Sequence, residues 1–375
     1  METVLAADVG GTHCTLALVK FENNNLENNK PVIIARKEYL TETISNFSNV
    51  VSDFLDYCTN KLNNQKIPSV KIEKTKMPVK AGIGAAGAVS DGRVMLTNAN
   101  LVVDVKELQE KTCLKKITLL NDFQVLALGV PFLSSADLTS IYALKNTADL
   151  NHHVTDITEV AEITDVNDIQ LDKSQLSDVK LVIGPGTGLG KSVLVYDKHS
   201  KTYTALASEG GHADLPLQTE FDIAFAEYLR NKKKNSGYIL NYHDVLSSKG
   251  LCQLYSFFAG DKHEGSATEI PFSTATEICL SRKTDERAEK AMRSFFRYFA
   301  QCCRNSALEF LSYDGIYLAG GFSQRYPEYL DELFVKEFLK HGSVYYQKIL
   351  KKIPIYLIKN NDVSLLGAGY AGTML

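Results

Sequence analysis

The sequence lacks the features that would place the chain in a membrane, outside the cell or on nucleic acid. No apolar run approaches the roughly 20 residues that span a bilayer, and no basic segment followed by an apolar one marks a secretory signal. No block of basic residues stands apart and the formal net charge is −3, so neither nucleic acid nor an anionic membrane is an expected partner. Together these absences lead us to expect a cytoplasmic protein.

Cysteine pairs with metal-ligand spacing are also absent. None of the seven cysteines forms a Cys-x-x-Cys motif, and Cys302 and Cys303 are adjacent within a helical pattern. We therefore expect buried thiols of a reducing compartment rather than disulfides or zinc ligands. The chain's 375 residues, 45% hydrophobic and 23% charged, are ordinary for a globular enzyme of about two domains.

A glycine turn between two strand-like runs opens the chain. The stretch Asp8-Val9-Gly10-Gly11-Thr12 follows one apolar run and precedes another, which predicts strand, turn and strand. Consecutive glycines favour positive φ and leave backbone N–H groups bare for a phosphate. Asp8 stands where a carboxylate would hold Mg²⁺, usually through water. A tight hairpin with an Asp-capped turn is the alternative interpretation.

A second glycine turn, Gly186-Thr187-Gly188, lies between the strand-like runs 179–183 and 192–196. Two such units in separate halves resemble the duplicated phosphate-binding architecture of the sugar kinase, actin and chaperone superfamily. The resemblance implies an α/β, two-domain actin-like ATPase (ribonuclease H-like) fold, in which each domain is a mixed β-sheet flanked by helices and ligands bind in the cleft between the domains. We expect a small domain from residues 1–119 plus about 359–375, and a large domain from residues 120–358.

A short apolar run, residues 117–120, ends in Asn121 and Asp122 before a helical pattern. Such a run is typical of a parallel strand that is covered on both faces. Open α/β sheets bind ligands at the carboxyl ends of these strands, so both side chains are candidate ligand contacts. The alternative is an Asx cap on the following helix.

Two further glycine pairs carry candidate ligand contacts. Glu209 and His212 flank one pair in a loop, where a carboxylate and an imidazole can bind adjacent sugar hydroxyls. Packing or capping by His212 is the alternative. Gly320 and Gly321 follow a strand, and a double glycine lets adenine and ribose lie against bare backbone.

Three other segments have clear patterns. The small-residue stretch 364–372 is expected to be a helix that packs closely at a domain junction. Thr219 to Asp222 has the spacing of a capping box at the start of a helix. The polar stretch 146–177 has no period and is expected to be a long surface excursion.

Seven short motifs occur in an order that resembles the bacterial-type ATP-dependent glucokinases, which are also found in some protists. They span nearly the whole chain: Asp8–Thr12, Leu96–Asn98, Asn121–Phe123, Gly184–Gly190, Glu209–Asp214, Leu318–Gly321 and Leu365–Gly369.

The resemblance implies transfer of the γ-phosphoryl group of ATP to the 6-hydroxyl of glucose, with Asp122 as general base. It implies sugar contacts from Asn98, Asn121, Glu209 and His212. It assigns the nucleotide to the glycine turns, at Asp8, Val9, Gly10, Gly11, Thr12, Gly186, Thr187, Gly188, Gly320 and Gly321. It also implies Mg²⁺ at Asp8, held through water, and a homodimer.

One departure from the family pattern concerns the sugar site. A Glu that binds sugar in this family is replaced by His243, and Asp244 stands beside it. A shift of one residue in the loop would let Asp244 substitute; otherwise an anionic acceptor for a hydroxyl group is missing. An ATP-dependent kinase of another hexose or of an N-acetylhexosamine is therefore an alternative, as is a non-catalytic sugar-binding relative.

Overall fold

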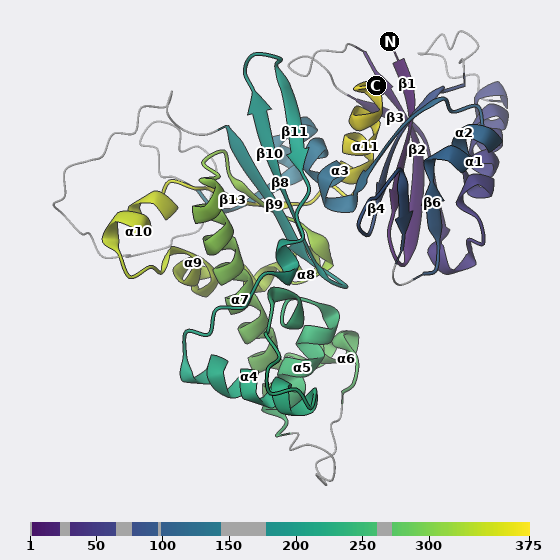
Figure 1. Cartoon of the computed structure of the whole chain (residues 1–375). Coiled ribbons are helices and arrows are strands. Elements are labelled where there is room, and N and C mark those ends of the chain that lie inside the picture. The colour runs from purple at the N-terminus through teal and green to yellow at the C-terminus, as the bar shows by residue number, and fades with distance from the viewer. Residues whose placement is uncertain (1, 23–30, 65–76, 97–98, 144–177, 261–271) are drawn as a thin grey trace.

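A computed structural model describes residues 2–22, 31–64, 77–96, 99–143, 178–260 and 272–375. The chain folds around two separate β-sheets, and two helices lie between them: α3 (Asp122–Gly129) and α11 (Val363–Thr373) (Figure 1). This two-sheet arrangement determines where the candidate ligand contacts meet.

The first sheet has the strand order β3-β2-β1-β4-β7. Three strands form an antiparallel meander, and two more run parallel to the first of them, β4 beside β1 and β7 beside β4. The strands are β1 (Glu2–Val9), β2 (His13–Phe21), β3 (Val32–Leu40), β4 (Lys80–Ala85) and β7 (Lys116–Asn121). A small hairpin, β5 (Arg93–Met95) and β6 (Val102–Asp104), lies beside them.

The second sheet repeats this topology. Its order is β11-β10-β9-β12-β13-β8, in which β9, β10 and β11 form the meander, β12 and β13 run parallel to β9, and β8 adds an antiparallel edge. The strands are β8 (Leu138–Tyr142), β9 (Val179–Pro185), β10 (Leu189–Asp197), β11 (Thr202–Leu206), β12 (Ile316–Leu318) and β13 (Ile355–Ile358). The duplication predicted from the two glycine turns is thus present in both sheets.

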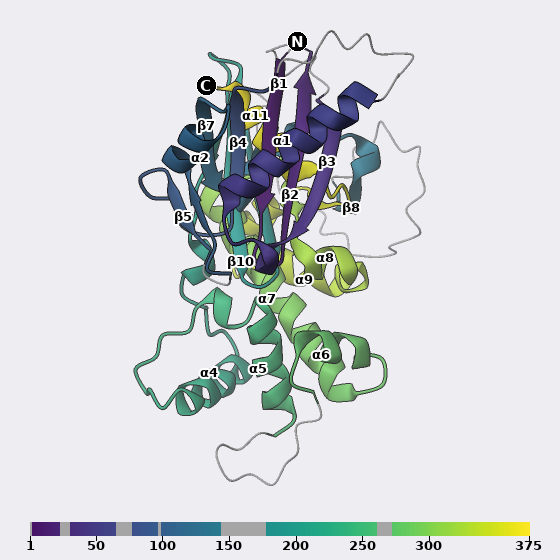
Figure 2. The ribbon, with the colours of Figure 1, turned by 90° about the vertical axis from the view of Figure 1, so that its right-hand side faces the viewer.

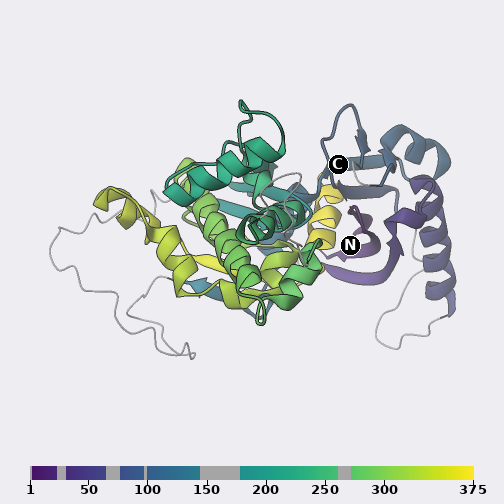
Figure 3. The same cartoon turned by 90° about the horizontal axis from the view of Figure 1, so that it is seen from below.

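Helices cover the outer face of each sheet. Apolar side chains of α1 (Phe47–Asn64) and α2 (Val105–Lys111) share a core with the first sheet, and Figure 2 shows α1 crossing its face. The second sheet shares a core with helices that gather on its own side, away from α1 and α2 (Figure 3). These are α4 (Glu220–Lys232), α5 (Ser248–Phe258), α6 (Ala275–Ser281), α7 (Glu286–Phe310), α8 (Gly320–Arg325), α9 (Glu332–Leu339) and α10 (Val344–Leu350).

The capping box predicted from Thr219 to Asp222 is confirmed at the start of α4. The Thr219 side chain accepts a hydrogen bond from the Asp222 backbone N–H, and the Asp222 carboxylate accepts one in return from the Thr219 N–H. This reciprocal pair satisfies two backbone donors that the first turn of a helix leaves open.

The small-residue helix α11 packs closely at the junction, as predicted. A side chain on Gly367 would overlap the backbone carbonyl oxygen of Val125 in α3, and a side chain on Gly82 in β4 would overlap that of Ala368. Hydrogen atoms at these positions therefore let α11 approach both α3 and the first sheet at backbone distance.

Two predictions are not tested by these elements. The excursion at 146–177 lies outside the described residues, and the domain limits at 119 and 359 stay a prediction. None of the helices that the structure describes combines the length and apolar character that crossing a bilayer requires.

The Gly367→Ala variant is expected to lose stability. Its methyl group would have to displace α11 from α3, and overpacking of this kind typically costs about 1–3 kcal/mol. Urea unfolding followed by circular dichroism measures the loss. Gly342→Ala is the matched control, because a Cβ there meets nothing within 4 Å, and it should change stability by less than about 0.5 kcal/mol. Equal midpoints for the two variants would contradict the close packing described here.

Candidate active site

Asp8 and Asp122 lie at the same edge of the first sheet. Asp8 is near the end of β1, Asp122 directly follows β7, and β4 lies between these parallel strands. Because parallel strands end at one edge, the topology brings both carboxylates together there, as predicted for ligand contacts in an α/β sheet.

The charges at this edge repel one another. Burial, first of all, raises the pKa of Asp122 to about 7, and the carboxylates of Asp8 and Glu209 add to the increase. A hydrogen bond from the Phe123 N–H to Asp122 Oδ1, 3.0 Å long, acts in the opposite direction. Burial likewise raises the pKa of Asp8 to about 6, against the effect of a hydrogen bond from the Ser364 hydroxyl group. The charge of Asp122 is therefore affected by two other carboxylates, and one of them, Glu209, comes from the second half of the chain.

The first glycine turn is closed by backbone contacts. The Gly10 N–H donates to the His13 carbonyl at 2.9 Å, and the buried Thr41 binds the turn twice, from its hydroxyl to the Gly10 carbonyl and from its N–H to the Thr12 carbonyl. Thr12 itself is exposed. The turn does not use the positive φ that glycine permits, because neither Gly10 nor Gly11 lies in the left-handed region. The glycines instead leave the turn without a side chain.

The second glycine turn is held by α5. The Gly186 N–H donates to the Gly188 carbonyl at 2.7 Å, and Ser248 donates to the Gly186 carbonyl from its backbone N–H and its hydroxyl group. Thr187 at the tip is exposed. Both turns are thus fixed by hydrogen bonds, as a phosphate-binding hairpin requires.

The start of α3 joins the second turn to Asp122. A side chain on Gly190, which follows that turn, would overlap the Phe123 ring. Gln124 Nε2 donates to the Ala205 carbonyl of β11 at 2.9 Å. Asp122 therefore lies between β7 of the first sheet and the hairpin of the second.

Asn121 has a structural role that favours the alternative interpretation of this residue. Its Oδ1 caps α3 by accepting from the Phe123 N–H at 2.9 Å, and its Nδ2 donates to the Gly87 carbonyl at 3.1 Å. Asp122 occupies the first turn of α3 rather than the cap position. Asn121 thus fixes the loop after β4 and the helix that carries Asp122, and its contact with sugar stays a prediction.

The loop with Glu209 and His212 forms a short 3-10 turn in which the His212 N–H donates to the Glu209 carbonyl at 2.9 Å. Both residues are exposed. The His212 ring nevertheless packs on that of His243, and its contact with sugar stays a prediction. Glu209 faces the carboxylate edge, since its charge contributes to the raised pKa of Asp122. Asn98 lies outside the described residues.

His243 lies at this loop, whereas Asp244 does not. The His243 ring stacks on His212 at 5.0 Å between centroids, and a Cβ on Gly188 would lie 2.8 Å from its Cε1 atom. Burial, followed by the His212 charge, lowers the His243 pKa, which keeps the imidazole neutral at pH 7.

The Asp244 carboxylate is committed to an internal network. It is buried, and it accepts hydrogen bonds from Lys233 Nζ at 3.0 Å and from the Tyr238 hydroxyl at 2.9 and 3.0 Å. The Asn241 N–H adds a further bond at 3.0 Å. These bonds favour the other alternative, that the anionic acceptor is missing, because moving this carboxylate would take it from the half-buried Lys233 ammonium and from the Tyr238 phenol. A sugar contact by Asp244 stays a prediction.

The two glycines assigned to adenosine differ. Gly320 has a positive φ of 81°, and a Cβ on it would lie 2.5 Å from the Pro185 carbonyl oxygen, so its bare surface is already covered by β9. A Cβ on Gly321 would meet only the Arg325 side chain, at 3.8 Å and beyond. Of the pair, Gly321 is the one open to a ligand.

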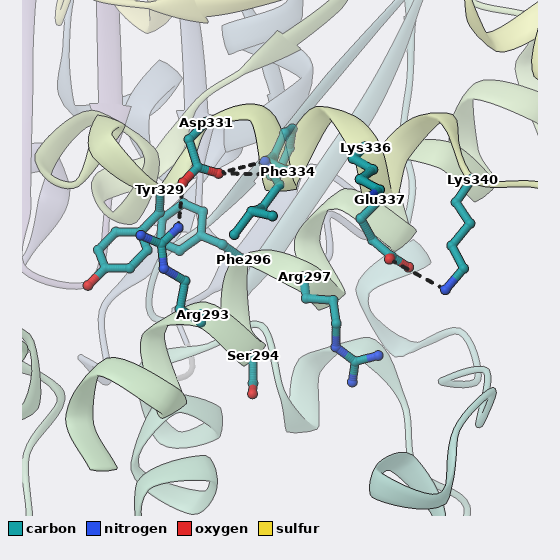
Figure 4. Close-up of a pocket in the computed structure, with 11 residues that line it drawn as sticks. Arg293, Ser294, Phe296, Arg297, Tyr329, Asp331, Phe334, Lys336, Glu337 and Lys340 are labelled. Carbon is teal, nitrogen blue, oxygen red and sulfur yellow. Dashed lines mark hydrogen bonds and ion pairs between the residues drawn. The ribbon is translucent and has the colours of Figure 1, made fainter. Parts of the chain in front are cut away.

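A separate hollow between α7 and α9 is lined by none of the described site residues (Figure 4). Two of its basic side chains are paired within it, Arg293 with Asp331 and Lys340 with Glu337. Because these two cations are already paired, neither offers an uncompensated charge to a ligand.

Two residues that support the site were not predicted from the sequence. Ser364 supports Asp8 from α11, and Thr41 supports the first turn from beyond β3. Each is a single hydroxyl far along the chain from its partner, so no local pattern marks it. Among the described residues, no group of three or more His, Cys, Asp or Glu side chains is arranged as a metal site.

Comparisons with known proteins agree with this geometry. The sequence model of the glucokinase family matches residues 5–157 and 149–374. A glucokinase from a Nostoc species is 26% identical, and the match covers 100% of both chains. The crystal structure of a glucokinase from an Antarctic psychrotroph shares the fold, with a TM-score of 0.73 at 23% identity over 100% of both chains.

A second solved structure shares the fold at greater distance. It is a ROK family glucokinase from Streptomyces griseus in complex with glucose and AMPPNP, with a TM-score of 0.53 at 16% identity, covering 100% of both chains. The predicted α/β actin-like ATPase fold is thereby confirmed. Since the family model spans nearly the entire sequence, the chain belongs to the glucokinase family.

Proposed function

We propose that this ATP-dependent sugar kinase transfers the γ-phosphoryl group of ATP to the 6-hydroxyl of glucose, with Asp122 as general base. The observation that carries the proposal is the position of Asp122. Asp8, whose charge acts on Asp122, leads into the first glycine turn, and the residue next to Asp122, Phe123, lies against Gly190 just after the second turn. The pKa of Asp122 is raised to about 7 by burial and by the Asp8 and Glu209 carboxylates.

A carboxylate with a raised pKa suits this chemistry. Asp122 accepts the proton of the hydroxyl as bonding to phosphorus makes that hydroxyl acidic, and a base whose pKa lies near the working pH is the most effective. Glu209, His212 and His243 bind the other hydroxyl groups of the sugar, and Asn121 positions the helix that carries the base.

The two turns hold the triphosphate through their backbone N–H groups, and Gly321 provides the open surface for adenosine. Asp8 fits a Mg²⁺ ion that takes its remaining ligands from phosphate and water, because it is a single fixed carboxylate beside the first turn. The ion, when bound, neutralises charge on the phosphates. The homodimer and the cytoplasmic location stay predictions.

A coupled kinase assay over glucose, fructose, mannose, glucosamine and N-acetylglucosamine tests the proposal. Glucose is expected to give the highest kcat/KM. Phosphorylation of another sugar in preference to glucose would favour the alternative that His243 suggests. ATP binding without any sugar phosphorylation would instead indicate a non-catalytic relative.

The Asp122→Asn variant should lose turnover but keep part of its affinity for glucose. General-base assistance contributes about 10²–10⁴-fold, so kcat is expected to fall at least about a hundredfold. Steady-state kinetics and calorimetric glucose binding measure the two effects. Asp56→Asn, on the exposed face of α1, is the matched control and should match the unmodified chain. A near-normal kcat for Asp122→Asn would remove this residue from the role.

The pH profile should report the same carboxylate. The base must be ionised to act, and its pKa is raised, so kcat/KM falls as the pH drops below about 7. This decline becomes steeper below about pH 6, where Asp8 is protonated as well. A bound cation favours the ionised forms, which moves the decline in kcat to lower pH. Initial rates from about pH 8 to about pH 5, with glucose well below its KM, measure the decline. A flat kcat/KM profile over that range contradicts this assignment.

A further inference from the structure

Lys191 is a buried lysine beneath the loop that carries Glu209 and His212. It lies on β10 just after the second glycine turn, and its side chain is only 7% exposed. Its Nζ donates to the Ser306 hydroxyl of α7 at 3.1 Å and lies 3.7 Å from Glu309 Oε2. The lysine therefore connects β10 to the longest helix that the structure describes.

The loop rests directly on Lys191. A side chain on Gly210 would overlap the Cε and Nζ atoms of Lys191, and one on Gly211 would overlap the Leu189 carbonyl oxygen. Both glycines of the loop are thus in contact with β10. Since Glu209 and His212 flank these glycines, the distance of their side chains from β10 depends on the Lys191 and Leu189 atoms that the loop contacts.

A buried ammonium group is an energetically unfavourable occupant of this space. Burying a charge costs free energy unless partners compensate, and an apolar side chain of similar length would fill the same volume without that cost. The compensation comes from Ser306 and Glu309, both on α7. Their pairing fixes the end of the lysine side chain, and with it the surface on which Gly210 lies.

We propose that Lys191 is a positioning residue for sugar binding. Through its hydrogen bond to Ser306 it holds the Glu209–His212 loop at the distance from β10 at which the loop binds sugar. It touches no reacting atom. The second glycine turn is held separately by Ser248, so the effect falls on sugar affinity rather than on ATP affinity or on the chemical step. This inference rests on the proposed function of the loop.

The test compares Lys191→Met, which keeps the length of the side chain and removes its charge, with Lys180→Met. Lys180 is a matched control, because it lies on the adjacent strand β9, is 12% exposed and pairs with Asp314 at 2.6 Å, away from the loop. Lys191→Met is expected to raise the KM for glucose about tenfold, the effect of losing about one hydrogen bond between the displaced loop and the sugar. Both kcat and the KM for ATP should change less than about twofold.

Ser306→Ala keeps the lysine and removes only its anchor, so it should raise the KM for glucose in the same direction. Thermal denaturation shows whether each variant is folded. If Lys191→Met is not folded, the KM of Ser306→Ala for glucose decides the test. The proposal is overturned if neither folded variant raises the KM for glucose above that of Lys180→Met, or if kcat falls while that KM is unchanged. Product formation by the unmodified chain tests the proposed function separately, and calorimetric glucose binding gives the same comparison of variants without turnover.

Discussion

The first turn of α3 is the constraint on which the site depends, because it is bonded to both halves of the molecule. Asn121 ties it to the loop after β4, while Phe123 and Gln124 tie it to β10 and β11. Asp122 lies between these attachments. Its carboxylate cannot shift relative to one sheet without straining contacts with the other, so the position of the proposed base follows from the packing of the two sheets.

The electrostatics of the site follow from the same geometry. Carboxylates from the ends of β1 and β7 are brought together by the parallel strands, and Glu209 approaches from the opposite half. Such a cluster is unfavourable by itself, because Asp8 and Asp122 are removed from water and the charges of Asp8 and Glu209 raise the pKa of Asp122 further. The cation that we propose at Asp8 would compensate this repulsion, so in that proposal the chain alone holds only part of the charge balance of the site.

Sequence reasoning located the parts of this site that local patterns define. The two turns, the strand that ends at Asn121 and the small-residue helix each carry a signature in glycine or in apolar runs, and each was found in place. Local patterns did not show which side chains surround a candidate residue. The Asp244 carboxylate is bonded to Lys233 and Tyr238, although no spacing rule marks this network, and Gly10 and Gly11 form their turn without the positive φ that glycine permits. Ser364 and Thr41 act across long separations in the chain, which a single sequence does not display.

The packing of α11 on the first sheet determines when that sheet is completed during synthesis. During synthesis this helix emerges after both sheets, yet it covers the inner face of β1 and β4 and supplies the hydroxyl group that binds Asp8. A nascent chain still on the ribosome therefore has its first sheet half uncovered, with Val4 and Ala6 facing solvent or a chaperone. The Asp8 carboxylate acquires its hydroxyl partner only once α11 has been made, so a nascent chain that lacks α11 also lacks this support.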